Sequence, residues 1–322
     1  MDTKSQVLRC LIENGEAGVS GERIAEALGL SRTAVWQAVQ KLKEAGHQIE
    51  SAGNKGYRYR KTDILSPEGI RFYLPDPWKG IDIFCYDSIS STNKEAKIMA
   101  IRGAKDKTVL AANRQTEGYG RFSREFWSPP GSIYTSVILR ADPVGKNTAL
   151  VTIKNAVAMK RAIDMIAGVD VQIKWVNDLY LREKKIAGIL TEGVMDYESG
   201  SISAVIVGTG INFAVREFPE ALRDIAGSIF PKAQPEAIRN ELMGAYLKEF
   251  FSILDAEDTA ALIAEYKAAS FVLGKTVRFV LDNKPLKGKA VDIDKEGELV
   301  VELPDGRRVS LFSGEISVKI EN

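Results

Sequence analysis

The chain has 322 residues, of which 45% are hydrophobic, and its 44 basic and 43 acidic residues leave a formal charge of +1. This length predicts two or three domains, and the near-zero charge means that nucleic-acid binding would need a local basic patch. Two cysteines, Cys10 and Cys85, and one histidine, His47, nearly exclude a disulfide framework, a four-cysteine zinc site, a multi-histidine metal site and serine–histidine–acid hydrolysis. We interpret His47 as an ordinary surface or turn residue.

Membrane and secretory segments are not predicted. No run of about 18 apolar residues occurs, and the N-terminus "MDTKSQVLRC" lacks the apolar core of a signal peptide. We therefore expect a cytoplasmic protein with no membrane partner.

Two short helices separated by a glycine-containing turn are predicted near the N-terminus. Apolar residues recur at helical spacing in both: Ile24, Ala25 and Leu28, then Val35, Val39 and Leu42. Ser31 can cap the second helix, because its hydroxyl can accept a hydrogen bond from a free backbone N–H. This arrangement is typical of a helix-turn-helix.

A basic segment follows the second helix. "QIESAGNKGYRYR" (residues 48–60) predicts two short strands around a turn at Asn54–Gly56, which resembles a wing. Residues 31–60 hold six Lys or Arg against two Glu, an excess that suits phosphate contacts. The predicted DNA-contacting residues are Ser31, Arg32, Thr33, Trp36, Gln37, Gln40, Lys55 and Arg58, with Arg60 as a further phosphate contact. A protein-docking helical module is the alternative, and Trp36 could equally belong to the core.

A linker with a short helix is predicted where three prolines, Pro67, Pro75 and Pro77, fall within eleven residues. Beyond it, strands are predicted at 108–115, 132–140, 171–175, 179–181, 186–192 and 204–213, and helices at 147–168 and 235–254. This order indicates an α+β domain rather than a regular βαβ array. From about residue 271, short strands alternate with turns, which predicts a small β-barrel.

Cations cluster in short motifs of the central region. They are Arg121 and Arg124 beside Gly118 and Gly120, Lys174 close to Asn177 and Asp178, and Lys185. Neither GxxxxGK[ST] nor GxGxxG is present, so a P-loop or dinucleotide site is not supported. Joining a carboxylic acid to a nucleoside triphosphate needs fixed positive charge, because both reacting groups are anions. Asp178 could hold Mg²⁺, which prefers carboxylate and phosphate oxygens.

Six ordered motifs resemble those of biotin–protein ligases. "QTEGYGRFSREFWS" (115–128) is similar to the family's biotin loop, roughly QxxGRGRxGRxW, and "KWVNDLYL" (174–181) to its KWPNDLYL. "SSTNKEA" (90–96), "KKIAGILTE" (184–192), "VIVGTGINF" (205–213) and "FSGEIS" (312–317) match further segments. The N-terminal helix-turn-helix extends the resemblance to the bifunctional branch, which also represses biotin-synthesis genes.

The resemblance implies an α+β fold in three domains. These are a winged helix-turn-helix (1–64), a biotin/lipoate-ligase-like catalytic domain (65–270) and a small SH3-like β-barrel (271–322). It implies a biotin–[acetyl-CoA-carboxylase] ligase that uses ATP and Mg²⁺ to form biotinyl-5′-AMP and then biotinylates a lysine of biotin carboxyl carrier protein. It also implies a homodimer, when the adenylate is bound, that binds operator DNA of biotin genes.

The resemblance also implies the site residues. Biotin would contact Ser91, Thr92, Asn93, Gln115, Tyr119, Gly120, Arg121 and Lys185, against an apolar wall of Ile186, Ala187, Gly188 and Ile189 with Phe126 or Trp127 nearby. ATP or the adenylate would contact Gly118, Arg121, Arg124, Lys174, Asn177, Asp178, Lys185 and Asn212. Catalysis would rest on Lys185 and Arg121, and the metal on Asp178.

Four positions depart from the family pattern. Tyr119 stands where many members have Arg, Ser123 replaces a loop glycine, Val176 replaces the proline before Asn177, and Phe126 stands in a usual Trp position. Two other functions stay open. A transcription factor that only senses a metabolite would not need Asp178, and a lipoate or octanoyl ligase would lack the loop and the wing.

Overall fold

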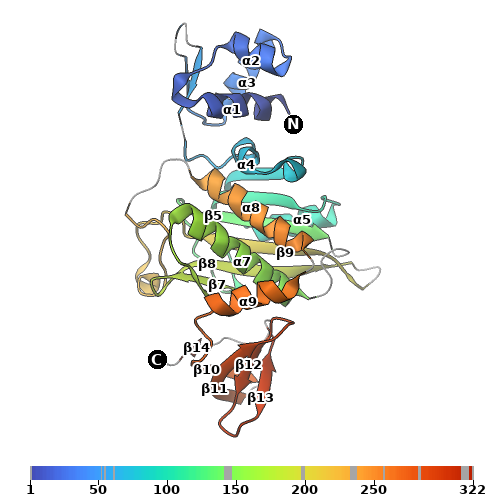
Figure 1. Cartoon of the computed structure of the whole chain (residues 1–322), viewed down its shortest axis with the longest axis vertical. Helices are drawn as coiled ribbons and strands as arrows, with labels where there is room; N and C mark the ends of the chain where they lie inside the picture. Colours follow the sequence, from blue (N-terminus) through green and yellow to red (C-terminus); the bar gives the residue numbers. More distant parts are fainter. Residues whose placement is uncertain are drawn as a thin grey trace. The chain divides into compact units, whose positions relative to one another are not determined.

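The computed structural model of the chain describes residues 2–51, 53, 56–60, 62–140, 147–196, 200–232, 238–256, 258–281, 284–312 and 319–320. Figure 1 labels the helices and strands along the chain, and backbone contacts divide the chain into two compact units. One comprises residues 1–85 with 234–248, and the other residues 86–233 with 249–322. The three domain boundaries that the sequence suggested stay a prediction.

The described elements comprise both helices and strands, with runs of consecutive described strands between residues 172 and 211 and between residues 276 and 320. The helices are α1 (Thr3–Asn14), η1 (Gly15–Ala17), α2 (Gly21–Leu28), α3 (Arg32–Glu44), α4 (Pro67–Tyr73), η3 (Asp76–Trp78), α5 (Thr92–Ile101), η4 (Arg121–Ser123), α7 (Thr148–Ala167), η5 (Glu220–Leu222), α8 (Arg239–Asp255) and α9 (Thr259–Ala269). The strands are β1 (Ile49–Ser51), β2 (Tyr57–Tyr59), β3 (Ile83–Ile89), β4 (Thr108–Gln115), β5 (Ile133–Arg140), β6 (Gln172–Lys174), β7 (Asp178–Leu181), β8 (Lys184–Met195), β9 (Ile202–Ile211), β10 (Thr276–Leu281), β11 (Lys284–Ile293), β12 (Leu299–Glu302), β13 (Arg308–Leu311) and β14 (Lys319–Ile320).

The first unit begins with the predicted winged helix-turn-helix. The α2–α3 pair packs through one core with α1, to which Ile24, Val35 and Leu42 each contribute a side chain no more than 1% exposed. The predicted cap at Ser31 is confirmed, because its Oγ accepts a hydrogen bond from the Ala34 N–H at 3.1 Å. Strands β1 and β2 pair antiparallel, as predicted for the wing. Asn54 and Lys55 of the predicted turn lie outside the described residues.

The expectation that His47 is an ordinary surface or turn residue is wrong, because the residue is buried and directly follows the turn at Ala45–Gly46. Its side chain is 4% exposed, and Nδ1 lies 3.1 Å from the Tyr59 hydroxyl. The backbone reverses at Gly46, whose φ is +94°, and the His47 N–H donates to the Leu42 carbonyl at 3.0 Å. This reversal directs the ring into the core beside the wing. Burial lowers the pKa of His47, so the ring is neutral at pH 7.

The proline-rich linker contains the short helix that the sequence predicts. Ser66 caps α4 through a 3.0 Å hydrogen bond from the Gly69 N–H, and Pro67 occupies its first turn. Within the same unit, Asn240 of α8 accepts from the Ser66 N–H and donates to the Ile64 carbonyl. Distant segments of the sequence thus hold the linker.

The second unit is built on a seven-stranded sheet of order β3-β4-β5-β9-β8-β7-β6. The pairings from β4 to β6 all run antiparallel. The α+β fold class is therefore confirmed. Among the described residues, no helix is both long and apolar enough to cross a membrane.

Side-chain alternation along β9 separates the two faces of this sheet. Ala204 and Ile206 pack with α5, and Gly208 and Gly210 continue that face. Thr209 points to the opposite face, where its Oγ1 accepts a 2.8 Å hydrogen bond from Asn155 of α7. A Cβ at Gly208 would overlap the Asn93 side chain, and one at Gly210 would overlap the Phe126 ring. The two glycines thus leave room for side chains of the pocket face.

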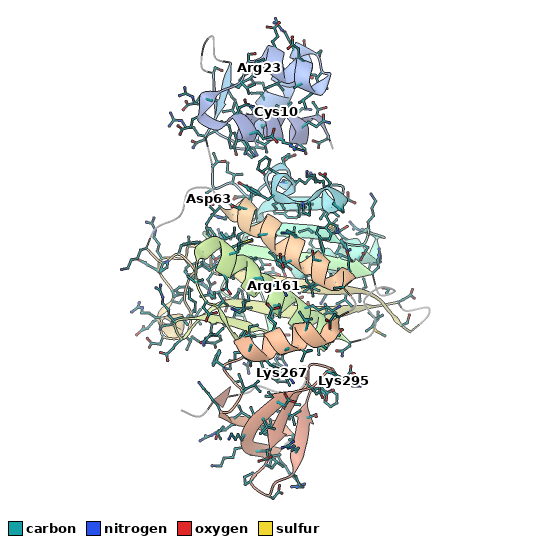
Figure 2. The ribbon with its side chains drawn as sticks, in the orientation of Figure 1. Cys10, Arg23, Asp63, Arg161, Lys267 and Lys295 are labelled. Atoms are coloured by element: carbon teal, nitrogen blue, oxygen red, sulfur yellow. The ribbon has the colours of Figure 1, made fainter. Side chains whose placement is uncertain are left out.

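Helices α7 and α9 and part of α8 are joined by charge as well as by packing. Arg161 of α7, labelled in Figure 2, pairs with Glu265 of α9 through two nitrogens at 2.9 and 2.5 Å, and with Glu249 at 3.1 Å. These carboxylates raise the pKa of Arg161 above its ordinary value.

The C-terminal strands form an antiparallel sheet of order β13-β12-β11-β10-β14. Its turn after β11 packs on the central domain. There the Gly297 carbonyl accepts a 3.0 Å hydrogen bond from Trp175 Nε1, and Lys267 of α9 pairs with Asp292 at 2.6 Å. Trp175 and Gly297 are 122 residues apart in the sequence, so this hydrogen bond ties the C-terminal sheet to the residue next to Lys174.

Candidate functional site

A pocket of about 430 Å³ opens on the face of the central sheet that carries α5. Thirteen of the predicted biotin and adenylate residues line it: Ser91, Thr92, Asn93, Gln115, Tyr119, Gly120, Arg121, Arg124, Lys174, Asn177, Asp178, Lys185 and Asn212. They come from strands and loops far apart in the sequence. The sheet order brings them together.

Two predicted residues lie elsewhere. Gly118 supports the base of the loop, where a Cβ would overlap Ser128 Oγ and crowd the Gln115 side chain. Ile186 was expected in the apolar wall, but it is fully buried and is not among the lining residues. The β7–β8 pairing is irregular here, since Tyr180 pairs with Lys185 and Leu179 with Ala187, and Ile186 between them is directed into the core.

The start of α5 forms one polar end of the pocket. Ser91 caps the helix by accepting from the Lys94 N–H at 3.5 Å. The Thr92 N–H and hydroxyl both donate to Gln115 Oε1, at 2.8 and 3.1 Å, and Gln115 Nε2 donates to Ser128 at 3.2 Å. These buried and half-buried side chains offer a fixed set of donors and acceptors to a small polar ligand.

The segment 116–128, here called the biotin loop, folds as a narrow hairpin. The Gly120 N–H donates to the Arg124 carbonyl at 2.8 Å, and the Phe126 N–H to the Gly118 carbonyl at 2.9 Å. At the tip, Phe122 and Ser123 have φ of +58° and +55°. This left-handed region favours glycine, so the replacement of the family's glycine by Ser123 places strain at the tip. Phe122 is 57% exposed there.

Positive charge exceeds negative charge on the pocket lining. Four cations, Arg121, Arg124, Lys174 and Lys185, face two carboxylates, Glu125 and Asp178. Burial lowers the pKa values of Arg121 and Lys174, although Asp178 acts in the opposite direction on both. The lining is therefore suited to a ligand with several negative charges.

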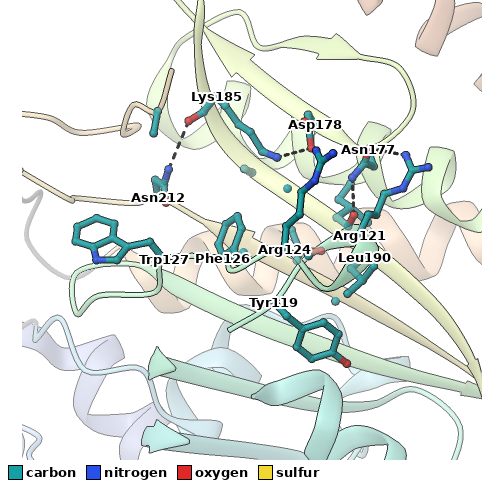
Figure 3. Close-up of a pocket in the computed structure, with 18 of the residues that line it drawn as sticks. Tyr119, Arg121, Arg124, Phe126, Trp127, Asn177, Asp178, Lys185, Leu190 and Asn212 are labelled. Carbon is teal, nitrogen blue, oxygen red and sulfur yellow. Dashed lines mark hydrogen bonds and ion pairs between the residues drawn. The ribbon is translucent and has the colours of Figure 1, made fainter. Parts of the chain in front are cut away.

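The charged side chains meet at Asp178, as Figure 3 shows. Lys185 Nζ lies 2.6 Å from Asp178 Oδ1, and Arg121 Nη1 donates to Asn177 Oδ1 at 3.4 Å. Asn177 is fixed to β8, because Nδ2 donates to the Ile189 carbonyl at 2.9 Å and its own carbonyl accepts from the Ile189 N–H at 2.8 Å. These two bonds place Asp178 despite the replacement of the family's proline by Val176.

An apolar half lies beside the charged half. The Phe126 ring rests on Gly188 and Gly210, and Trp127 packs against Phe218 with ring centroids 5.6 Å apart. Ile225 also lines this side. Phe126 thus contributes an aromatic wall, and a ligand with one apolar and one anionic end fits the pocket.

The side chains around Asp178 could hold a divalent cation. Asp178 offers carboxylate oxygens beside the amide of Asn177, and Mg²⁺ is usually held by one or two carboxylates together with substrate phosphates. Groups of three or more His, Cys, Asp or Glu with metal-site geometry do not occur in the described ranges. The phosphates would thus have to supply the remaining oxygens.

Six of the predicted DNA-contacting residues belong to α3 or to its N-cap. Ser31, Arg32, Thr33, Trp36 and Gln37 are exposed and Gln40 is half-buried. Trp36 is 54% exposed and so is not a core residue. Arg58 of β2 is half-buried, and Lys55 lies outside the described residues.

Sequence reasoning missed several residues of the pocket region. Glu192 and Lys97 form a 2.6 Å ion pair next to Tyr119, and Phe218 and Ile225 line the apolar half. The alternation along "KKIAGILTE" could have placed Glu192 on the same face as Gly188. No local pattern marks the other three.

Comparisons with known proteins agree with this geometry. Residues 85–212 match the Biotin/lipoate A/B protein ligase family, residues 3–58 an HTH domain and residues 272–319 the Biotin protein ligase C terminal domain. The bifunctional ligase/repressor BirA of Bacillus subtilis is 33% identical over 323 residues, which cover 98% of each chain. The protein of the same name from Escherichia coli is 27% identical over 317 residues, covering 97% of this chain and 96% of its own.

A solved structure supports the same assignment. The biotin protein ligase from Aquifex aeolicus in complex with biotin and ATP is 26% identical and superposes with a TM-score of 0.65, covering 74% of this chain and 99% of its own. That protein lacks a counterpart for about a quarter of this chain, whereas the Bacillus relative spans nearly all of it. The chain therefore belongs to the family of bifunctional biotin–protein ligases and repressors.

Proposed function

We propose that this chain activates biotin with ATP and transfers it to a lysine of biotin carboxyl carrier protein. In the first step a biotin carboxylate oxygen attacks the α-phosphorus, a P–O bond breaks, and pyrophosphate leaves. In the second step the acceptor amine, after losing a proton, attacks the acyl carbon and AMP leaves. The supporting observation is the pocket itself, in which four cations face two carboxylates beside an apolar half.

The residues divide the work by charge. Lys185 and Arg121 offset the repulsion between the carboxylate and the α-phosphate, and Arg124 and Lys174 receive the other phosphates. Ser91, Thr92 and Gln115 hold the polar ring system of biotin, while Phe126 and Trp127 cover its apolar part. Water is kept away from the adenylate by the biotin loop.

Mg²⁺ would be held by Asp178 together with phosphate oxygens. When bound, it neutralises part of the charge on the departing pyrophosphate. Lys185 now occupies Asp178 Oδ1 at 2.6 Å, so its ammonium would have to share or leave this carboxylate when a metal arrives.

The test separates the half-reactions. Wild type is incubated with biotin, ATP and Mg²⁺, pyrophosphate release is followed, and a biotin-carrier domain is then added to look for the labelled lysine. Asp178→Asn should lose most pyrophosphate release but retain transfer from preformed biotinyl-adenylate. Equal losses in both steps would contradict the metal assignment. A wild type without adenylation would instead favour a chain that only senses its ligand.

We also propose that the adenylate-bound chain dimerises and represses biotin genes by binding their operator DNA through α3 and the wing. A ligand shifts this equilibrium only if it binds the dimer-competent state more tightly. Phe122, 57% exposed at the tip of the biotin loop, is positioned to meet a second copy when the loop closes over the adenylate. Sedimentation with and without biotinyl-adenylate should show ligand-promoted dimers that Phe122→Gly loses. A cytoplasmic location stays a prediction from the sequence.

A further inference from the structure

One carboxylate joins three elements around the biotin loop. Glu192 of β8 accepts hydrogen bonds at Oε2 from the Tyr119 hydroxyl and from Asn93 Nδ2, both at 2.8 Å. Its Oε1 pairs with Lys97 Nζ at 2.6 Å, and Lys97 also lies 3.4 Å from the Tyr119 hydroxyl. The loop, α5 and β8 therefore meet at a single side chain.

This contact differs from an exposed ion pair. The side chains of Lys97 and Glu192 are 33% and 22% exposed, so water competes only partly for the carboxylate. Burial raises the pKa of Tyr119, and the hydrogen bond to Glu192 raises it further. The phenol consequently keeps its proton at physiological pH and acts as a donor. A hydrogen bond to an ionised acceptor is roughly twice as strong as one between neutral groups.

The same carboxylate sets the orientation of Asn93. Asn93 is 5% exposed, its Oδ1 accepts from the Ser136 hydroxyl at 2.6 Å, and Nδ2 donates to both Glu192 and the Leu190 carbonyl. Both amide donors are thus used within the protein. Asn93 supports the pocket wall, and its predicted direct hydrogen bond to biotin would be limited to the second lone pair of Oδ1.

Tyr119 is the point where the loop needs such support. It stands between Gly118 and Gly120, which have no side chains to pack, and it precedes the strained tip at Phe122 and Ser123. In Figure 3 its ring points away from the Lys185–Asp178 pair, toward the opposite side of the pocket from the reacting groups. Tyr119 is therefore placed to hold the loop rather than to contact phosphate.

We propose that Glu192, through Tyr119, is a positioning residue that holds the biotin loop in its ligand-binding arrangement before biotin arrives. A loop that is already ordered loses less conformational entropy when it closes over a ligand. The benefit falls on retention of biotin and its adenylate rather than on the chemical step. This inference rests on the proposed ligase function, in which this loop covers the adenylate.

The experiment compares Tyr119→Phe and Glu192→Gln with Glu117→Gln in the full-length chain. Glu117 lies on the same loop and also pairs with α5, through Lys94, but its side chain is 61% exposed, so its removal should have little effect. Two readouts are needed: the dissociation rate of preformed biotinyl-adenylate, and amide hydrogen exchange of residues 116–128 without ligand.

We expect both test variants to release the adenylate about tenfold faster and to raise the KM for biotin, with kcat nearly unchanged. Exchange of the loop amides should rise in the ligand-free variants. The double variant should be no worse than Glu192→Gln alone, because the charged hydrogen bond between the two side chains is already absent there. The control should match wild type in both readouts.

Unchanged exchange and unchanged release in Tyr119→Phe would overturn the inference. The Phe variant keeps the ring, so a general loss of folding, checked by thermal unfolding, is not expected to confuse the result. If wild type formed no adenylate, the proposed function would fail. The exchange measurement would still decide whether Glu192 holds the loop.

Discussion

Lys185 offers the sharpest test of the charge arrangement in the pocket. Replacing it by Met nearly keeps the length of the side chain and removes the ammonium. The side chain is closely packed, because a Cβ added at Gly188 would lie 3.1 Å from it. At hydrogen-bond contact a unit charge in a half-exposed site interacts by about 4 kcal/mol with an opposite charge. Asp178 pairs with the same ammonium and reduces its effect on the ligand. We therefore expect the rate of adenylation to fall by a few hundredfold, roughly the effect of removing one fixed donor.

Stability should change much less than the rate. Asp178 keeps the electrostatic attraction of Lys174 and Arg121 when Lys185 is gone. We therefore expect Lys185→Met to lose about 1 kcal/mol, a fall in Tm of roughly 2–4 °C.

The neighbouring lysine provides the control. Lys184 is 38% exposed and its Nζ donates to the carbonyls of Arg223 and Asp224 at 3.0 and 2.6 Å, away from Asp178. Lys184→Met should adenylate biotin at the wild-type rate. Pyrophosphate release at saturating biotin and ATP measures both variants. Equal rates for Lys185→Met and Lys184→Met would refute the assignment of Lys185 to the reacting anions.

Three further predictions follow from backbone strain and from burial. Glu183 lies in the β7–β8 turn with φ of +65°, a conformation that favours glycine. Glu183→Gly should therefore stabilise the second unit by about 0.5–1 kcal/mol, measured by urea unfolding. A loss of stability would show that Glu183 is not strained there. Burial lowers the pKa of His47, so the unfolded chain binds a proton first, and stability should decline as pH falls below the ordinary value of 6.5. His47→Gln should flatten that decline in urea titrations, and parallel curves would count against it. Burial also lowers the pKa of Lys174, so the rate of adenylation should begin to fall at a pH below 10.5. Lys174→Arg should shift this alkaline fall to higher pH. A fall at the same pH in the variant would assign it to another group.

Local rules determined much of the N-terminal and central elements. The periodicity of Val35, Val39 and Leu42 placed α3, and the Ser31 hydroxyl placed its start, because both effects act within one or two helical turns. The strand at residues 108–115 was predicted with the bounds that β4 has. The motif residues of the pocket could be named because their order along the chain resembles that of a known family, which the comparisons then confirmed.

Side-chain environments were decided by tertiary structure. His47 and Trp36 stand eleven residues apart, yet one is 4% and the other 54% exposed. The reversal at Gly46 and the position of the wing make this difference. The turn at Gly46 is local, but the position of the wing, which brings Tyr59 against the His47 ring, is not encoded by the residues next to His47.

The pocket shows the same division. Period-two alternation places Glu192 and Gly188 on one face of β8, a property of the strand alone. The partners of Glu192 come from α5 and the biotin loop, 95 and 73 residues away, and Trp175 meets Gly297 across 122 residues. Such contacts exist only after the sheet order is set, because the register between β5, β9, β8 and β7 determines which distant side chains meet. The sequence by itself therefore determined which groups the site could use, and tertiary structure decided which of them line the pocket and which contact one another.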